Sequence, residues 1–145
     1  MPRRLPHIAA LLLLTGLAIA TRALTDDEVT VDYRDGTYYG SLRLRTPASP
    51  AVVMGVLTDF DRMPEFMPGL TSSRIVARHH NQYQVAQQGK VSFGPFSMPF
   101  ESLRQIEVVD GRRILSRSLS GSARRMQSVM QVRPLEGGSE IDYRI

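Results

Sequence analysis

Two aspartates, Asp59 and Asp61, flank Phe60 and form the nearest approach in this chain to a paired-carboxylate site. Paired carboxylates can divide the general-acid and general-base roles when their surroundings separate their pKa values. Aspartate also suits the first turn of a helix, where it accepts backbone N–H bonds and faces the positive end of the helix dipole. We expect both residues to cap helix ends, with Asp61 at the start of a short helix.

The histidines do not form a metal-binding or catalytic group. His7 lies in an N-terminal apolar segment, while His79 and His80 are adjacent, so a strand would direct them to opposite faces. The chain has no cysteine, which excludes thiol chemistry and thiolate metal sites. The sequence therefore predicts neither a metal site nor a bound cofactor.

The serines and glycines give no sign of a nucleophile or a phosphate loop. No serine lies in a G-x-S-x-G turn, although four recur at alternate positions: Ser116, Ser118, Ser120 and Ser122. The glycines are dispersed at turn positions and are not gathered into a phosphate-binding motif. Any catalysis would have to use other groups.

Arg117 is a candidate for binding an anionic group. It alternates with Leu115 and Leu119, so a strand would place all three side chains on one face. A charge on an apolar face is costly unless it is paired, and a ligand carboxylate, phosphate or enolate could pair with it. The alternative places Arg113 and Arg117 on a solvent-facing side, with the two leucines exposed.

The segment LTDFDRMPEFMPGL, residues 57–70, combines large apolar side chains with two prolines. Methionine and phenylalanine suit an adaptable apolar pocket because methionine is flexible and polarizable. The candidate pocket residues are Phe60, Met63, Phe66 and Met67. The alternative is that the same side chains simply pack two short helices against a sheet.

Further candidates come from alternation within the predicted strands. An apolar pocket with a few polar groups is typical of small-molecule sites. We predict that six side chains face inward and bind ligand: Tyr83, Gln87, Arg117, Met126, Met130 and Tyr143.

The charge pattern argues against nucleic-acid binding. The formal net charge is +4, and Lys90 is the single lysine among 18 basic residues. The arginines are scattered through strands and turns, whereas phosphate binding needs them on one face. Peripheral contact with anionic lipid stays open through the arginines of one hairpin, with a solvated hairpin as the alternative: Arg112, Arg113, Arg124 and Arg125.

The first 20 residues have the layout of a secretory signal peptide. Arg3 and Arg4 precede an apolar run over residues 8–20, which ends in Ala-Ile-Ala. A helix over that run would be about 20 Å long, shorter than a bilayer core of about 30 Å. We expect export to the periplasm or medium with cleavage near Ala20, or less favourably after Ala23. An uncleaved anchor is the alternative.

The remaining residues, 28–145, predict one α+β domain. Residues 28–46 alternate around Asp35-Gly36, a hairpin signal. Ser49 and Pro50 suit the cap and first turn of a helix, and Pro68-Gly69 ends a second one. Strands are expected over residues 73–79, 83–91, 98–109, 114–119, 126–132 and 141–145, with Asn81-Gln82 in a turn. Strands that follow one helical pair indicate an antiparallel sheet of six or seven strands.

This order resembles the helix-grip fold of the START-like (SRPBCC) superfamily, which includes polyketide cyclase/dehydrase-like and coenzyme Q-binding proteins. The most specific match is VLTDFDRMPEFMPGL, residues 56–70. Residues 128–134, the turn Gly137-Gly138 and residues 141–143 are similar to the last two strands, although a tryptophan common there is absent. The resemblance covers residues 37–145.

The resemblance implies a long C-terminal helix, gripped by the curved sheet, that forms one wall of the cavity. This chain stops at Ile145, within a strand pattern. We therefore expect that the chain is truncated at its C-terminus or that a partner supplies the missing cover. The oligomeric state stays open.

Three functions remain. The leading hypothesis is an exported, non-catalytic protein that binds a hydrophobic small molecule such as a lipid, quinone or polyketide-like compound. The second is a cyclase- or aromatase-like enzyme, in which Tyr83, Gln87 or Arg117 polarises a carbonyl or moves a proton. The third is an interaction module that docks a partner helix on the open face of the sheet.

Overall fold

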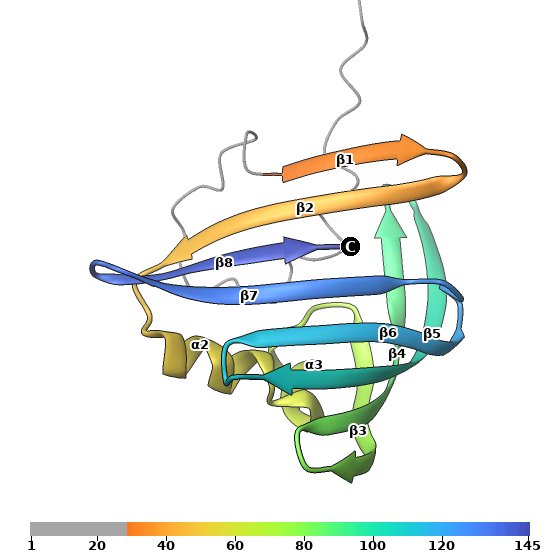
Figure 1. Cartoon of the computed structure of the whole chain (residues 1–145). Helices are drawn as coiled ribbons and strands as arrows, with labels where there is room; N and C mark the ends of the chain where they lie inside the picture. The colour runs from red at the N-terminus through yellow and green to blue at the C-terminus, as the bar shows by residue number, and fades with distance from the viewer. Residues whose placement is uncertain (1–28) are drawn as a thin grey trace, which may run out of the picture.

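The computed structural model describes residues 29–145, and within them one curved antiparallel sheet of eight strands dominates (Figure 1). The strand order is β1-β2-β8-β7-β6-β5-β4-β3. The predicted α+β helix-grip architecture is confirmed, with one or two more strands than expected. The elements are β1 (Val29–Arg34), β2 (Thr37–Thr46), α2 (Pro50–Leu57), the 3-10 helix η2 (Phe60–Arg62), α3 (Met63–Phe66), β3 (Leu70–His79), β4 (Gln82–Phe93), β5 (Phe96–Val109), β6 (Arg113–Gly121), β7 (Gln127–Leu135) and β8 (Gly138–Arg144).

Short turns join most neighbouring strands. Asp35-Gly36 and Asp110-Gly111 both take positive φ angles, +50° and +78° in the first turn and +53° and +61° in the second. Such pairs of left-handed residues match the twist of two-residue hairpins. The β3–β4 turn lies one residue earlier than predicted, at His80 (φ +54°) and Asn81. His80 therefore leaves the strand, and the expectation that His79 and His80 point to opposite faces is wrong: their ring centroids lie 4.3 Å apart.

Helix α2 begins as predicted. Ser49 takes the N-cap position, its hydroxyl accepts the Val52 N–H at 3.4 Å, and Pro50 occupies the first turn. Val53 and Met54 are buried against the sheet, whereas Val52 is exposed. The helix thus has one face on β7 and β8 and one in solvent.

The capping role predicted for Asp61 is wrong. Helix η2 begins at Phe60, so Asp61 lies inside it, and its Oδ1 accepts the Ile75 N–H at 2.8 Å. Asp59 occupies the N-cap position without a side-chain cap bond and lies 3.4 Å from Nη1 of Arg62. Strand β3 is the last in the sheet, so Ile75 has no strand on its free side, and Asp61 supplies the missing acceptor.

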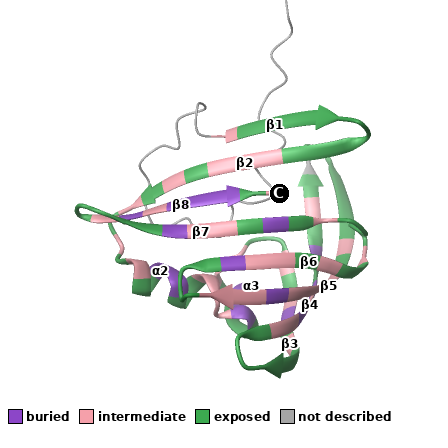
Figure 2. Ribbon diagram, viewed as in Figure 1, coloured by how far each residue is buried: buried purple, intermediate pink, exposed green. Residues whose placement is uncertain are grey.

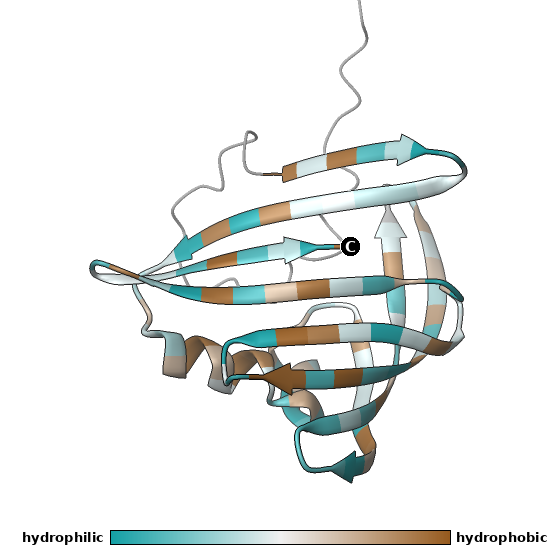
Figure 3. Ribbon diagram, in the orientation of Figure 1, coloured by the Kyte–Doolittle hydropathy of each residue, from teal (hydrophilic) through white to brown (hydrophobic). Residues whose placement is uncertain are grey.

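The core lies on one face of the sheet, here called the inner face, where α2, η2 and α3 pack. Figure 2 shows that buried residues are spaced along the strands and on the helices, and Figure 3 shows the matching alternation of hydropathy. The buried apolar cluster comprises Val53, Met54, Phe60, Met63, Val85, Ile106, Ile114, Val132 and Ile141. No helix among residues 29–145 is long and apolar enough to cross a membrane.

The helices cover only part of the inner face. Residues paired directly across neighbouring strands have their side chains on the same face of the sheet. Following these pairs from the buried Val85 and Ile141 shows that the inner face extends to the ends of β1, β2 and β5. The side chains at those ends are exposed: Val31, Tyr33, Tyr38, Phe96 and Met98. The long helix implied by the resemblance is not among the described residues, and the predicted signal peptide lies outside them.

Candidate functional site

Gln87 is the centre of a polar cluster on the inner face. It lies on β4 and is only 7% exposed. Its Nε2 donates to Ser73 Oγ at 3.1 Å and to Met63 Sδ at 3.4 Å, while its Oε1 accepts a bond from Arg104 Nη2 at 2.7 Å. Three partners fix which end of the amide faces Arg104. The sequence correctly placed Gln87 on the inner face.

Arg104 is the cation of this cluster, and it was not among the site residues predicted from the sequence. It lies on β5 directly opposite Val85 of the core, so its side chain is on the inner face. Its Nε is buried and has no hydrogen-bond partner among the described residues. Burial lowers the pKa of the guanidinium, and the nearby Tyr143 opposes that shift. The available signal was the alternation of Arg104 with Ile106 and Val108.

A β-bulge lies next to Arg104. The pairing of β5 with β6 shifts between Leu103 and Arg104, so that Leu119 has no opposite residue. Gly121, just beyond, has φ +114°, and a Cβ there would lie 2.8 Å from Ser102 Cα. Bulges bend strands and re-aim side chains, and they are frequent beside functional sites. This one lies where β6 passes the Arg104 side chain.

Tyr143 of β8 completes the polar cluster from the other side. It is 6% exposed and faces inward, as predicted. Burial raises the pKa of its hydroxyl, while a hydrogen bond with Ser128 and the charge of Arg104 oppose the shift. The phenol therefore keeps its proton at neutral pH and can donate a hydrogen bond. The nearby Ser116 hydroxyl is buried without a partner among the described residues.

The predicted apolar residues divide between core and rim. Phe60 and Met63 are 2% and 9% exposed and belong to the core, which is the packing alternative. Phe66 and Met67 are half-buried against that core. Tyr83 packs on Phe60 with ring centroids 5.4 Å apart. All five belong to the apolar core or pack against it, and Met63 also contacts Gln87.

The two remaining methionines lie along β7. Met130 is half-buried, faces inward and pairs with Ile114 and Tyr143 across the neighbouring strands. Met126 precedes β7 at the rim, where its carbonyl accepts the Ser118 N–H at 2.8 Å. Met130 therefore adjoins the polar cluster, and Met126 lies at its edge.

The inward position predicted for Arg117 is wrong. Arg117 pairs with Gln105 and Gln127, both on the opposite, outer face, and its side chain is exposed. The face was assigned from Leu115 and Leu119, but Ile114 is the buried residue of this strand and Leu119 lies in the bulge. The solvent-facing alternative is correct for Arg113, Arg117 and Leu119, whereas Leu115 is half-buried.

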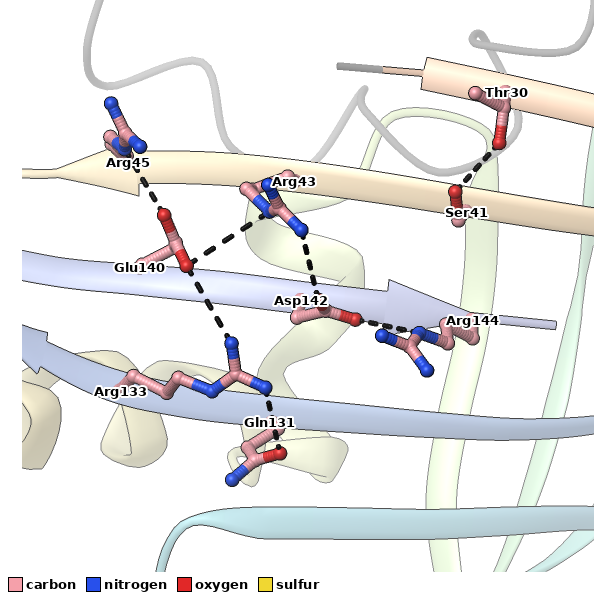
Figure 4. A network of polar contacts seen from close by, with 9 residues as sticks. All are labelled: Thr30, Ser41, Arg43, Arg45, Gln131, Arg133, Glu140, Asp142 and Arg144. Atoms are coloured by element: carbon pink, nitrogen blue, oxygen red, sulfur yellow. Dashed lines mark hydrogen bonds and ion pairs between the residues drawn. The ribbon is translucent and has the colours of Figure 1, made fainter.

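The outer face carries a different polar arrangement, an ion-pair network on β2, β7 and β8 (Figure 4). Glu140 contacts three arginines, Arg45 at 3.1 Å, Arg133 at 3.8 Å and Arg43 at 3.9 Å. Asp142 contacts Arg144 at 3.1 Å and Arg43 at 3.7 Å. Every arginine of this network therefore has a carboxylate partner.

Two other features of the described residues carry no site. No three His, Cys, Asp or Glu side chains among residues 29–145 lie close enough to hold a metal ion. A hollow of about 280 Å³ near Gly121 is lined mostly by outer-face side chains, including Arg74, Gln88 and Glu101. The polar cluster on the inner face is the better candidate because the buried side chains of Gln87 and Tyr143 both lie beside Arg104.

Comparisons with known proteins agree with this geometry. The family model for polyketide cyclase / dehydrase and lipid transport matches residues 46–144, more than half of the chain. No curated protein matches the chain. Three similar solved structures are a protein from Thermus thermophilus, a START superfamily protein from Mycobacterium smegmatis and a fragment of a STAR-related lipid transfer protein from Xanthomonas axonopodis.

These structures share the fold at low sequence identity. The Thermus protein is 19% identical with a TM-score of 0.63, covering 72% of this chain and 69% of its own. The Mycobacterium protein is 15% identical with a TM-score of 0.59, covering 73% of this chain and 73% of its own. The Xanthomonas protein is 14% identical with a TM-score of 0.64, covering 84% of this chain and 77% of its own. The match over residues 46–144 and the helix-grip sheet together show that the chain belongs to the polyketide cyclase / dehydrase and lipid transport family of START-like proteins.

Proposed function

We propose that this protein is an exported, non-catalytic binding protein that holds a hydrophobic small molecule, such as a lipid, quinone or polyketide-like compound, against the inner face of its sheet. One observation carries the proposal. The inner face continues from the buried core into apolar side chains that nothing among the described residues covers. A small polar cluster lies between these two regions.

The uncovered side chains are large and lie on both arms of the curved sheet. Tyr33 and Tyr38 of the β1–β2 hairpin are 59% and 72% exposed, and Phe96 and Met98 of β5 are 73% and 57% exposed. Removing about 200 Å² of such surface from water would contribute roughly 5 kcal/mol. That is enough to drive binding of a small apolar molecule.

The family and one structural neighbour support the same class of ligand. The matched family includes lipid transport, and the Xanthomonas neighbour is described as a lipid transfer protein. The low identity to that neighbour leaves the ligand to be identified by experiment. Export rests on the apolar leader over residues 1–20, and sequencing the N-terminus of the exported protein tests it: Thr21 is expected, and an intact Met1 would exclude cleavage.

Native mass spectrometry of the purified protein tests binding directly. We expect an apolar compound to remain bound, or a fluorescent lipid probe to bind and be displaced by unlabelled lipid. Met98→Ser should weaken that binding because Met98 lies on the inner face, whereas Val129→Ser, on the outer face, should not. A protein that is empty and does not bind the probe would contradict the proposal.

A cyclase-like enzyme is the second candidate, because the protonated Tyr143 hydroxyl lies near the Arg104 guanidinium. A neutral donor beside a cation could polarise a ligand carbonyl. Turnover of a poly-β-ketone substrate that is lost in Tyr143→Phe, with affinity retained, would favour the enzyme. Affinity and turnover that fall together would favour a binding role for Tyr143.

A further inference from the structure

We propose that Arg104 forms an oxyanion-binding site at the centre of the inner face, so that the ligand is an amphipathic molecule with an apolar body and one anionic head group, a carboxylate or a phosphate. This inference rests on the proposed function and specifies the chemical class of its ligand. It is carried by the surroundings of Arg104, which contain no counter-charge from any residue that the structure describes.

Among residues 29–145, the inner face has no carboxylate that could neutralise Arg104. The register of the sheet places every acidic side chain of its eight strands on the outer face: Asp32, Glu101, Glu107, Glu140 and Asp142. On the helical segment, Asp59 and Glu65 pair with Arg62, and Asp61 binds the Ile75 N–H. The other acidic residues from 29 to 145 lie in turns: Asp35, Asp110 and Glu136.

Arg104 is nevertheless held in place. The Gln87 amide accepts from Nη2 at 2.7 Å and is itself fixed by Ser73 and Met63. A guanidinium presents five donors, and its Nε is buried and unpartnered among the described residues. Arg104 is half-buried, and a guanidinium with a buried Nε and no counter-charge among the described residues is costly; a ligand oxyanion would offset that cost.

Additional donors lie in the same region. Ser116 Oγ is buried without a partner in the described part of the chain, and its strand position is inward, beside Ile106 and Ser128. The Tyr143 hydroxyl, on the far side, is close enough to Arg104 for each to affect the pKa of the other. An oxyanion between these groups would receive charge-assisted hydrogen bonds, which are stronger than neutral ones.

The apolar part of the ligand has a defined path. Along β5 the inner face runs from Arg104 through Phe100 to Met98 and Phe96. At about 3.4 Å per residue, Arg104 and Met98 are about 20 Å apart along the strand. A head group at Arg104 would therefore leave an extended chain lying over side chains that are otherwise exposed.

Three probes with the same chain separate the head group from the tail: decanoate, decyl phosphate and decanol, each titrated into the full chain at pH 7.5 by calorimetry. We expect the better anionic probe to bind about tenfold tighter than decanol, or more, because hydrogen bonds to charged groups are among the stronger ones. The tighter anion identifies the head group as carboxylate or phosphate. Equal affinity for both anions and decanol would overturn the site.

Three variants assign the preference to Arg104. Arg104→Gln should bind decanol as wild type does and lose the anion preference, and Arg104→Lys should retain part of it. Arg117→Gln removes an exposed arginine on the neighbouring strand and should change nothing. A preference that survives Arg104→Gln overturns the assignment. Failure of wild type to bind any of the three probes would instead contradict the proposed hydrophobic-ligand function. If a variant does not fold, the comparison of the three probes on the wild-type protein still measures the preference for an anionic head group.

Discussion

The two faces of the sheet use arginine in opposite ways. On the outer face, Arg43, Arg45 and Arg133 surround Glu140, so that each guanidinium has a carboxylate partner within the protein (Figure 4). On the inner face, Arg104 has an amide partner and no carboxylate among the described residues. The outer arginines have carboxylate partners within the protein, whereas the inner arginine would gain a counter-charge from the anionic ligand proposed above. The position of counter-charges, more than the number of arginines, distinguishes a surface network from a binding site.

The largest test of this contrast concerns packing. Ile106 lies two residues from Arg104 on the inner face and is 2% exposed. Ile106→Ala should lower the free energy of unfolding by about 2–5 kcal/mol, as expected for a buried large-to-small change. Val129→Ala, at a 45% exposed position of the outer face, should cost under about 1 kcal/mol. Urea unfolding measures the free energy of unfolding of both variants. Equal losses would show that the outer face is packed as tightly as the core.

The next test removes the residue that positions Arg104. Gln87→Leu leaves Nη2 of Arg104 and Oγ of Ser73 without their present partner, and should cost about 1–3 kcal/mol. Gln88→Leu changes the adjacent, exposed side chain of the outer face and should be nearly neutral. Urea unfolding of the two variants measures the difference, and a stable Gln87→Leu variant would mean that Gln87 is dispensable to the cluster.

A smaller effect is expected on the outer face. Glu140→Gln removes the carboxylate shared by three arginines whose side chains are 52%, 65% and 46% exposed. Exposed partners are screened by solvent, so the loss should be about 1 kcal/mol and should shrink in roughly 1 M salt. Thermal unfolding at two salt concentrations provides the measurement. A loss as large as that of Ile106→Ala would reverse the contrast between the faces.

The smallest expected effect is on how the free energy of unfolding changes at alkaline pH. Burial raises the pKa of folded Tyr143 above its ordinary value of 10.0, so the folded state holds this proton more tightly than the unfolded state. The contribution of this proton to the free energy of unfolding is fully present below about pH 10. It is lost as the pH rises from there through the raised pKa of the folded state. Tyr143→Phe should flatten the profile of unfolding free energy from about pH 9 to 11, whereas Tyr38→Phe should retain the loss. Parallel profiles for wild type and Tyr143→Phe would contradict this.

The sequence predicted most of the fold because local chemistry determines it. The left-handed Asp-Gly turns and the Ser49-Pro50 helix start depend on residues a few positions apart. Asp61 was misassigned because its acceptor role depends on Ile75 of the edge strand, a contact between segments that alternation does not report. Local patterns thus indicated the elements, and the contacts between them required the structure.

The site was harder to predict for a related reason. Alternation places side chains in two sets, but it does not say which set is buried. On β6 the leucines suggested that Arg117 faced inward, while the bulge at Leu119 and the buried Ile114 put it outside. On β5, Arg104 shares the period of Ile106 and could have been found. Gln87 and Tyr143 were placed correctly because their strands carry no bulge where β4 meets β5 or where β7 meets β8.

The strand order has a consequence for how the chain reaches this structure. Every neighbouring pair in the sheet is sequential except β2 and β8, where Ser41 pairs with Arg144. Pairing β2 with β8 closes a long loop, and the entropic cost of closing it precedes the contacts that stabilise the pair. We expect the β3–β8 meander to form first from its hairpins and the β1–β2 ribbon to dock last, after the transition state. Substitutions in β2 should then mainly speed unfolding, and those in the meander should slow folding.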